Sequence, residues 1–591
     1  MQLSKVQHEI VTAPLGSAIV TAGAGSGKTR VLTERFAHVI TDLGIPRDGI
    51  IALTFTNKAA AEMKRRVEEI LPPEMCPLCM SLTCYLGTFH SWCARFLRSY
   101  ICAPWTQSFT IYDTKDSDKV WKKLGCEDYV DREDKADEYR AALEKSNAID
   151  FDMLLELTYE ILGKNREVRE RLQNKMQYIL VDEFQDTNEI QYKIVKTLAE
   201  RHRNIMVVGD EDQCIYSWRG ASAENLNRFR RDFPDTKIYK LEQNFRSSGN
   251  IVGLANKLVS NNQNRLDKVL FSDLENGKIQ CSQYYDERHE AQTVAMTIKS
   301  EHGRGVDYKN FAVLMRLNAT SRYFEEQFRA FGIPHIIWGG FKFYERAEIK
   351  STLNYLRLLV NPRDTVAQMD VLNFPKRGLG DVTVTKIMNG DTATLTKKAR
   401  EGYDRYLDTM RALQNLADNA TLTDLAEEIV PTIGLGEYFK TGKEEDESRL
   451  ENVYQLVQAI KDFAKSNPDA TLGDYLQTVS LVQDTDNGGN GDAVVISTVH
   501  SAKGLEFDNV FVIGLEDGTF PMFRAKESSA QMEEERRLLY VAITRARKNL
   551  YLSHCESRFI HGTRTYPRPS EFLVDCGLVK PAPKFRDYDT W

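Results

Sequence analysis

The chain has 591 residues, of which 42% are hydrophobic and 28% charged, and this composition excludes a wholly disordered protein. Its net charge of −7 excludes a global positive field, so any nucleic-acid site has to be a local cluster of basic and aromatic residues. No apolar run reaches the ~20 residues of a membrane span and the N-terminus lacks a signal-peptide pattern. We therefore expect no membrane partner and a cytoplasmic, intracellular location.

The first motif is a glycine-rich loop that predicts a phosphate site. An apolar run at 18–20 precedes the loop and a helical pattern follows it, which is the context such a loop requires. Glycines let backbone N–H groups converge on an anion, the lysine supplies a cation, and the threonine hydroxyl can bind Mg²⁺. The alternative is a glycine-rich turn, since the general pattern begins with glycine rather than alanine. The loop comprises Ala22, Gly23, Ala24, Gly25, Ser26, Gly27, Lys28 and Thr29.

Two further stretches favour contacts with a nucleic-acid strand. The apolar run at 50–53 predicts a buried parallel strand, and Phe55 and Asn57 follow its end, where ligand groups collect in such sheets. In residues 87–98, aromatic side chains alternate with hydroxyl, imidazole and guanidinium groups, a pattern typical of binding sites for single-stranded nucleic acid. Amphipathic helices with polar caps are the alternative. Gln7 is a candidate for reading an adenine edge or, alternatively, a surface glutamine.

Paired carboxylates follow the next predicted strand, at 178–181. Asp182 can hold Mg²⁺ and Glu183 can orient or deprotonate an attacking water, unless the pair is only an acidic turn. A strand at 205–208 precedes Gln213, whose neutral amide could sense a γ-phosphate. Tyr216 and Trp218 are spaced to meet bases a few residues further on.

Ten cysteines are scattered along the chain, which favours reduced thiols. Cys76 and Cys79, with Cys84 shortly after them, form half of a zinc pattern. No second Cys-x-x-Cys completes the ligand set, so zinc at these three residues is the minor alternative.

In this order, these motifs resemble those of the superfamily 1A DNA helicases of the UvrD/Rep/PcrA type. The loop beginning with Ala22 is that family's own version of the phosphate loop. Residues 494–521 resemble its fifth motif and residues 533–547 its sixth, so the likeness spans almost the whole chain.

The resemblance implies a role for each matching residue. Lys28, Asp182, Glu183, Gln213, Arg246 and Arg545 are the expected catalytic residues, with Glu183 as the base and the two arginines and Gln213 at the γ-phosphate. Besides the phosphate loop, the nucleotide site takes in Gln7, Arg30, Phe245 and Glu506, and Thr29 and Asp182 serve Mg²⁺. Single-stranded DNA is expected to contact Phe55, Asn57, Thr88, His90, Tyr216, Trp218 and His500.

The same resemblance implies an α/β fold with two RecA-like parallel-sheet P-loop domains, each with a mainly helical inserted subdomain. The expected boundaries are 1–98 and 177–243 for the first sheet domain (1A), 99–176 for its insertion (1B), 244–364 and 491–591 for the second sheet domain with a short tail (2A), and 365–490 for the mobile insertion (2B).

The implied function is ATP-dependent 3′-to-5′ movement on single-stranded DNA and unwinding at single-strand/duplex junctions, in repair, recombination or replication. The cofactors are ATP and Mg²⁺, and protein partners are unknown. Two alternatives stay open. One is a DNA-binding ATPase that displaces other proteins, and the other is the motor subunit of a helicase–nuclease complex.

Overall fold

The computed structural model describes residues 3–72, 81–126, 132–217, 224–263, 265, 268–317, 320–338, 344, 346–439, 444–480, 491–560 and 563–580. The chain divides into two compact units. Unit 1 comprises Met1–Phe89, Arg166–Gly340 and Gln483–Trp591, and unit 2 comprises His90–Asn165 and Phe341–Val482. The six segments expected from the sequence divide the chain more finely than this, and their boundaries stay predictions.

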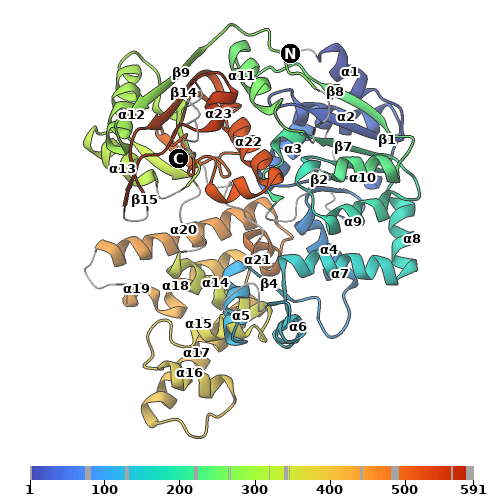
Figure 1. The fold of residues 1–591 in the computed structure, drawn as a ribbon. Coiled ribbons are helices and arrows are strands. Elements are labelled where there is room, and N and C mark those ends of the chain that lie inside the picture. Colours follow the sequence, from blue (N-terminus) through green and yellow to red (C-terminus); the bar gives the residue numbers. More distant parts are fainter. Residues whose placement is uncertain are drawn as a thin grey trace, which may run out of the picture. The chain divides into compact units, whose positions relative to one another are not determined.

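The first sheet of unit 1 has six parallel strands in the order β3-β2-β6-β7-β1-β8 (Figure 1). Its inner strands are short runs of aliphatic residues, as expected for strands that are covered on both faces. Since all six run the same way, the loops after β1, β2, β6 and β7 meet at one edge. The strands are β1 (Ser17–Ala22), β2 (Ile50–Thr54), β3 (Tyr85–Thr88), β6 (Tyr178–Val181), β7 (Ile205–Gly209) and β8 (Lys237–Leu241).

The second sheet, also in unit 1, has six parallel strands in the order β11-β12-β10-β13-β14-β9. Together the two sheets confirm the expected fold class of two parallel-sheet α/β domains. The strands are β9 (Lys278–Tyr284), β10 (Phe311–Met315), β11 (His335–Trp338), β12 (Val494–Thr498), β13 (Phe507–Val512) and β14 (Ala546–Cys555), and a separate hairpin pairs β15 (Arg558–Ile560) with β16 (Thr563–Thr565).

Helices flank both sheets of unit 1. Local caps explain several of their starts: Thr56 accepts a hydrogen bond from the Ala59 N–H at the start of α3, and Asn188 and Gln191 form a reciprocal capping box at α9. The helices are α1 (Lys5–Val11), α2 (Lys28–Thr41), α3 (Asn57–Ile70), α8 (Arg166–Lys175), α9 (Glu189–Ala199), α10 (Asn225–Asp232), α11 (Gly249–Val259), α12 (Glu287–His302), α13 (Ser321–Ala330), α22 (Ser529–Ile543) and α23 (Glu571–Asp575).

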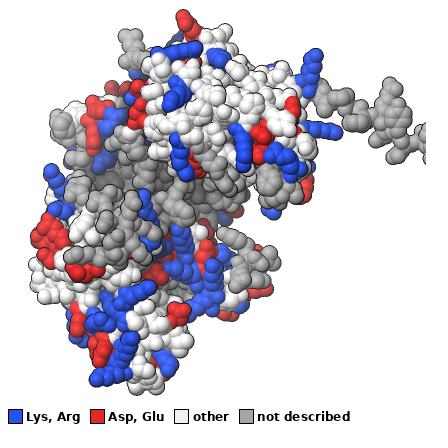
Figure 2. Space-filling model, turned by 90° about the vertical axis from the view of Figure 1, so that its left-hand side faces the viewer, with Lys and Arg blue, Asp and Glu red and all other residues white. Residues whose placement is uncertain are grey.

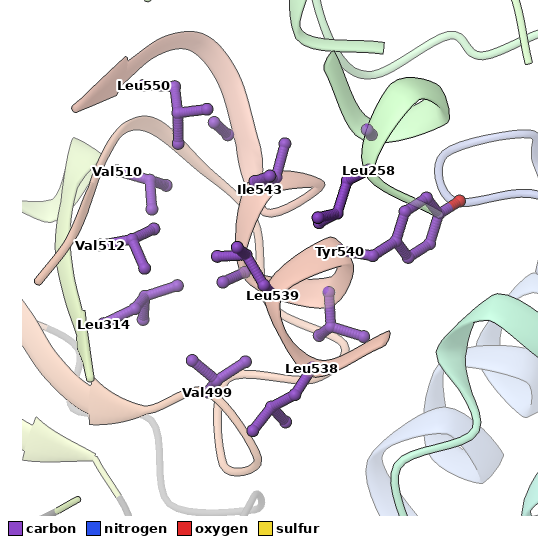
Figure 3. Close-up of a cluster of buried hydrophobic side chains, with 14 of the residues drawn as sticks. Leu258, Leu314, Val499, Val510, Val512, Leu538, Leu539, Tyr540, Ile543 and Leu550 are labelled. Atoms are coloured by element: carbon purple, nitrogen blue, oxygen red, sulfur yellow. The ribbon is translucent and has the colours of Figure 1, made fainter. Parts of the chain in front are cut away.

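A large apolar cluster fixes α22 against the second sheet (Figure 3). Leu539 and Ile543 of this helix lie among buried side chains of β10, β13 and β14, and Leu258 of α11 closes the same core. Tyr540 is fully buried too, but Figure 3 shows its hydroxyl pointing away from the leucine and valine side chains. The helix therefore has a firmly held apolar face and a second face available for polar contacts.

Unit 2 is mainly helical and draws on both of its segments. The first provides most of α4 (Phe89–Tyr100), then β4 (Thr110–Tyr112), α5 (Thr114–Lys123), α6 (Ala136–Lys145), β5 (Ala148–Asp150) and α7 (Phe151–Lys164). The second provides α14 (Ala347–Val360), α15 (Thr365–Val371), α16 (Asp381–Met388), α17 (Lys397–Asn419), α18 (Leu422–Ile433), α19 (Leu435–Tyr438), α20 (Glu444–Ser466) and α21 (Leu472–Ser480). In the part of the chain that is described, no helix combines the length and apolar character needed to cross a bilayer.

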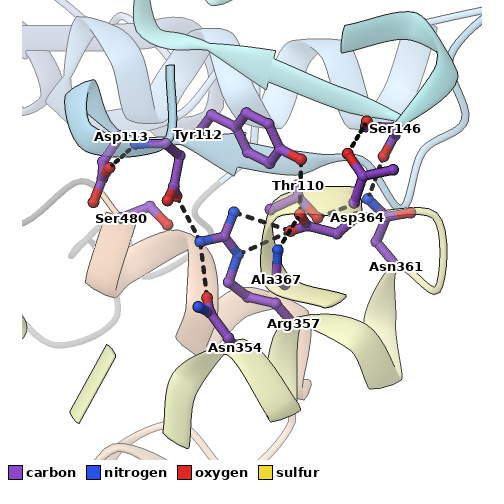
Figure 4. A network of polar contacts seen from close by, with 12 residues as sticks. Thr110, Tyr112, Asp113, Ser146, Asn354, Arg357, Asn361, Asp364, Ala367 and Ser480 are labelled. Atoms are coloured by element: carbon purple, nitrogen blue, oxygen red, sulfur yellow. Dashed lines mark hydrogen bonds and ion pairs between the residues drawn. The ribbon is translucent and has the colours of Figure 1, made fainter. Parts of the chain in front are cut away.

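A buried polar network joins the two segments of unit 2 (Figure 4). The Arg357 guanidinium lies 2.6 Å from an Asp116 carboxylate oxygen and donates to Asp364 at 3.0 Å. The Tyr112 hydroxyl donates to the other Asp364 oxygen at 2.7 Å. Burial opposes ionisation of Asp116, but Arg357 and Lys350 outweigh it and lower the pKa of Asp116 to about 2. The network is thus an ion cluster whose members depend on one another.

We expect Arg357→Met to lower the free energy of unfolding of unit 2 by about 3–5 kcal/mol, because Asp116 and Asp364 stay buried after losing their shared cation. Hydrogen exchange of the α5 and α14 amides, followed by mass spectrometry, measures the loss within this unit. The control is Arg363→Met, since Arg363 is exposed. Equal protection in the two variants would contradict a stabilising role for the network.

Candidate functional site

The glycine-rich loop lies between β1 and α2, where the sequence predicts it. Gly25 and Gly27 adopt positive φ values of 66° and 83°. Gly27 is the N-cap of α2 and provides no side-chain cap, so the helix N-terminus can receive an anion. The Lys28 ammonium donates to the Gly23 carbonyl at 3.4 Å. The loop therefore has the backbone geometry and the cation that a phosphate site needs.

The Gln7 side chain hydrogen-bonds the phosphate loop. Its side-chain N–H donates to the Ser26 carbonyl at 3.0 Å, and its carbonyl accepts from the Ser4 N–H in the capping box of α1. Both ends of the amide are thus engaged within the protein. Contact between Gln7 and an adenine stays a prediction.

The paired carboxylates at the end of β6 lie beside the loop; Asp182 is buried and Glu183 is partly exposed. Burial raises the pKa of Asp182 to about 7, with a further contribution from the Glu183 charge. Burial also opposes ionisation of Glu183, but Lys28 and Lys503 together with a hydrogen bond from Gln185 outweigh it and lower its pKa. At neutral pH Glu183 is therefore the carboxylate ready to accept a proton.

The backbone holds Glu183 in an unusual conformation. Its φ of 49° lies in the left-handed region, which non-glycine residues seldom occupy outside functional sites. The Glu183 N–H donates to the Asp182 carboxylate at 2.9 Å, and the Gln185 side-chain N–H donates to the Glu183 carboxylate at 2.5 Å. These two bonds fix both carboxyl groups at the edge of the sheet.

The turn after β7 brings Gln213 to the same edge. Its side-chain N–H donates to Asp210 at 2.5 Å, and its carbonyl oxygen lies 3.4 Å from an Arg545 guanidinium nitrogen. Gln185 connects this turn to the paired carboxylates, because its side-chain carbonyl accepts from the Asp210 N–H at 2.9 Å. The amide of Gln213 therefore has one defined orientation.

Two arginines join the site from outside the loop: Arg246 lies between β8 and α11, and Arg545 directly precedes β14 of the second sheet. A Cβ placed on Gly25 would lie 2.7 Å from the Cβ of Arg246, so this arginine is packed directly on the loop. Arg246 contacts Glu506 at 2.5 Å and the Thr544 carbonyl at 3.4 Å. Burial lowers the pKa of both Arg246 and Arg545, that of Arg545 to about 9. Arg246 thus lies on the loop, and Arg545 lies beside Gln213.

The remaining nucleotide-site candidates border this cluster. Phe245 donates its N–H to the Gly25 carbonyl at 2.9 Å, while its ring is 47% exposed. Arg30 belongs to the first turn of α2. Glu506 pairs with Arg246 and Arg547, so its carboxylate is occupied by protein cations here. A ribose contact of Glu506 stays a prediction.

The DNA candidates divide between the two units. Phe55 and Tyr216 stack with ring centroids 5.3 Å apart, and the Tyr216 hydroxyl donates to the His500 carbonyl at 3.4 Å. Asn57 begins α3 and Thr88 ends β3, both in unit 1. His90 lies in unit 2, where its ring is 5.6 Å from that of Phe151. Trp218 lies outside the described residues.

One side chain of this site had no role in the sequence-based expectations. The Lys503 ammonium contacts the Asp186 carboxylate at 2.5 Å and donates to the backbone carbonyl of Gln213 at 2.8 Å. It also lies 5.0 Å from the centre of the Tyr216 ring. Burial raises the pKa of Asp186 to about 7, although Lys503 opposes the shift. The position of Lys503 within the fifth motif, three residues after His500, is the signal that could have identified it. Lys503 connects the carboxylate edge to the aromatic stack.

Two groups of side chains are candidate metal ligands. Asp182 and the Thr29 hydroxyl offer hard oxygen donors beside the phosphate loop, a donor set that suits Mg²⁺ rather than zinc. Cys84 is a buried free thiol, whereas Cys76 and Cys79 fall outside the described residues. Among the residues that the structure describes, no group of three His, Cys, Asp or Glu side chains could hold a metal ion.

Comparisons with known proteins agree over nearly the whole chain. Residues 239–557 match the model of the UvrD-like helicase C-terminal domain, and residues 3–137 and 131–234 match that of the UvrD/REP helicase N-terminal domain. The chain is 38% identical to a Bacillus subtilis protein named ATP-dependent DNA helicase PcrA, over 97% of this chain and 85% of that protein. Proteins of the same name from Staphylococcus aureus and Staphylococcus epidermidis are 36% identical over 96% and 97% of this chain and 85% and 86% of their own lengths.

We expect Gly25→Ala to weaken binding of a fluorescent nucleoside triphosphate by roughly tenfold or more. An added methyl group would both strain the left-handed backbone and collide with Arg246 Cβ and with Asn244 Nδ2, 2.9 Å away. The control is Gly44→Ala, since Gly44 has a similar φ of 69° but open space around its Cβ position. Nucleotide affinity that falls equally in both variants would show that backbone strain alone is responsible.

Proposed function

Because the chain belongs to the UvrD-like helicase family, we propose that it is an ATP-driven motor that moves 3′ to 5′ along single-stranded DNA. It unwinds duplex DNA at single-strand/duplex junctions and acts inside the cell in repair, recombination or replication. The contact between Gln213 of the first sheet domain and Arg545 of the second carries this proposal. It supports a site in which one triphosphate is read from both domains.

Hydrolysis in this proposal begins with a water aligned by Glu183. Water oxygen bonds to the γ-phosphorus while the bond from that phosphorus to the bridging oxygen of ADP breaks, and Glu183 takes the water proton. Lys28 neutralises the β- and γ-phosphates. Arg246 and Arg545 stabilise the charge that develops in the transition state, and Gln213 hydrogen-bonds the γ-phosphate. The products are ADP and inorganic phosphate.

Thr29 and Asp182 would hold Mg²⁺ beside these phosphates. When bound, Mg²⁺ supplies positive charge to the β- and γ-phosphate oxygens. The buried carboxyl of Asp182 and the start of α2, which no side chain caps, support this assignment. For the rest of the nucleotide, we assign base stacking to Phe245, the adenine edge to Gln7 and Arg30, and the ribose to Glu506.

The aromatic stack provides the DNA grip in this proposal. Phe55 and Tyr216 offer flat rings on which bases can stack, and Asn57, Thr88, His90, Trp218 and His500 add polar contacts to the strand. With a net charge of −7, the protein has to attract DNA through local clusters. Figure 2 shows such runs of lysine and arginine side chains, with carboxylates between them, over the lower part of the molecule.

Lys503 supplies the connection between hydrolysis and DNA. It contacts Asp186 on the nucleotide side and the Tyr216 ring on the other, so a change in charge near Asp186 changes the forces on Tyr216. A bound triphosphate draws Arg246 and Arg545 together across the loop, and its hydrolysis releases them. Repeated closing and opening then moves the strand across the aromatic side chains, one cycle for each ATP.

We expect single-stranded DNA to stimulate ATP hydrolysis, and Glu183→Gln to lower the stimulated kcat by at least ~100-fold, because an amide cannot accept the water proton. A phosphate-release assay with and without oligonucleotide measures both effects. Lys28→Ala should abolish turnover as well. The control is Glu200→Gln, since Glu200 is an exposed acid at the end of α9. Normal turnover in Glu183→Gln would refute the assignment of the base.

Polarity is tested with duplexes that carry a single-stranded tail at one end. We expect strand displacement on a 3′-tailed duplex in the presence of ATP and Mg²⁺, and little on a 5′-tailed or blunt duplex of the same sequence. Displacement of a streptavidin block from single-stranded DNA, measured in parallel, detects movement without unwinding. Preference for the 5′ tail would overturn the proposed direction, and stimulated hydrolysis without movement would favour a passive DNA-binding ATPase.

A further inference from the structure

Three consecutive carboxylates at the end of β7 share one buried ammonium group. The Lys268 Nζ lies 2.5 Å from Asp210, 2.8 Å from Glu211 and 3.1 Å from Asp212. Its side chain is 1% exposed, and the three carboxylates are buried as well. A second cation, Arg265, pairs with Asp212 at 3.0 Å. Such a cluster is costly to bury unless every member is paired, so its geometry is tightly constrained.

The main chain around Lys268 is fixed on two sides. The Leu270 N–H and carbonyl both bond the Asn256 side chain of α11, and the Phe271 N–H donates to the Glu242 carbonyl at 3.0 Å. A Cβ added to Gly23 would lie 2.1 Å from Leu270 Cδ2, so Leu270 rests directly on the phosphate loop. Lys268 therefore projects from a rigid segment that is packed against the nucleotide site.

Lys268 and Gln213 bind opposite oxygens of the same carboxylate. Lys268 contacts Asp210 Oδ1, and the Gln213 side-chain N–H donates to Asp210 Oδ2 at 2.5 Å. With its N–H group held in this way, Gln213 directs its carbonyl oxygen to Arg545, 3.4 Å away. Lys268 thus acts on Gln213 through one intervening residue.

We propose that Lys268 is a positioning residue for ATP hydrolysis, which holds the Asp210 carboxylate so that Gln213 keeps its amide oriented toward Arg545 and the γ-phosphate. The proposal rests on the proposed function, since it concerns the rate of the same reaction. Without Lys268, the buried carboxylates repel one another and one of them takes up a proton. A protonated Asp210 can donate to the Gln213 carbonyl, and the amide then turns its oxygen away from Arg545.

The charges of the cluster suggest how to separate positioning from folding. Asp210, Glu211 and Asp212 face Lys268 and Arg265, which leaves one net negative charge. Lys268→Met leaves two, and adding Glu211→Gln restores one. Glu211 accepts from the Thr21 hydroxyl at 3.2 Å and makes no bond to Gln213, so its amide variant keeps the orienting pair intact.

The test is a steady-state comparison of DNA-stimulated ATP hydrolysis. We expect Lys268→Met to lower kcat by at least ~10-fold, which is about 1.4 kcal/mol, while KM for ATP changes by less than about threefold. Lys268→Met combined with Glu211→Gln should recover kcat to within about threefold of the wild type. Asp210→Asn leaves Lys268 paired with Glu211 and Asp212 but offers one acceptor oxygen where Lys268 and Gln213 now use two, so it should show the same kcat loss. Lys257→Met is the control, because the Lys257 ammonium donates to the Cys576 carbonyl instead.

Thermal unfolding of each variant is measured alongside. Wild-type kcat in Lys268→Met or in Asp210→Asn would overturn the positioning role. So would a kcat loss that tracks lost folding and is not recovered by Glu211→Gln. Should Lys268→Met fail to fold, Asp210→Asn decides the question alone. A wild-type protein without DNA-stimulated turnover would overturn the proposed function and this inference with it, whereas an active wild type beside an unaffected Lys268→Met overturns only the latter.

Discussion

Burial of many negative charges at one edge of the first sheet is the constraint on which the rest of this structure depends. Asp182, Asp186 and Asp210 are buried there, and Glu183 is partly buried beside them. Carboxylates in such a place need cations nearby, or they take up protons. Lys28 comes from the first sheet domain itself, and further cations come from chain segments beyond β8. The two sheets are thus joined through charge pairs as well as through apolar packing.

Charge pairing of this kind gives a nucleotide an effective means of changing the structure. In this structure Arg246 forms an ion pair with Glu506, and a bound triphosphate would offer the guanidinium a stronger partner. Every such exchange alters how neighbouring cations are shared among the remaining carboxylates. Because Lys503 also faces the Tyr216 ring, the same exchange reaches the aromatic stack without any long mechanical lever. In the function proposed above, these shared cations would provide the switch between two arrangements that a nucleotide-driven motor requires.

Sequence patterns were informative wherever local chemistry decides the outcome. Aliphatic runs such as those of β6 and β7 predict buried strands, and the loops that follow them carry the expected side chains. Edge strands such as β8 and β9 consist largely of exposed and partly buried residues rather than an aliphatic run, which is why no strand was predicted there. The pairings of charges could not be predicted either. Lys503 meets Asp186 across 317 residues, and nothing local in the chain indicates which carboxylate a distant lysine will reach.

The division of unit 2 between two distant chain segments has a consequence for how the protein is made. Asp116 and Arg357 are separated by 241 residues, so the first acquires its buried partner only after the second has left the ribosome. At the usual rate of synthesis that interval is roughly 10–50 s. During it, Asp116 and Tyr112 lack the side chains that they contact in the finished protein, while the first sheet can already assemble. The earlier segment of unit 2 should therefore complete its folding only late in synthesis.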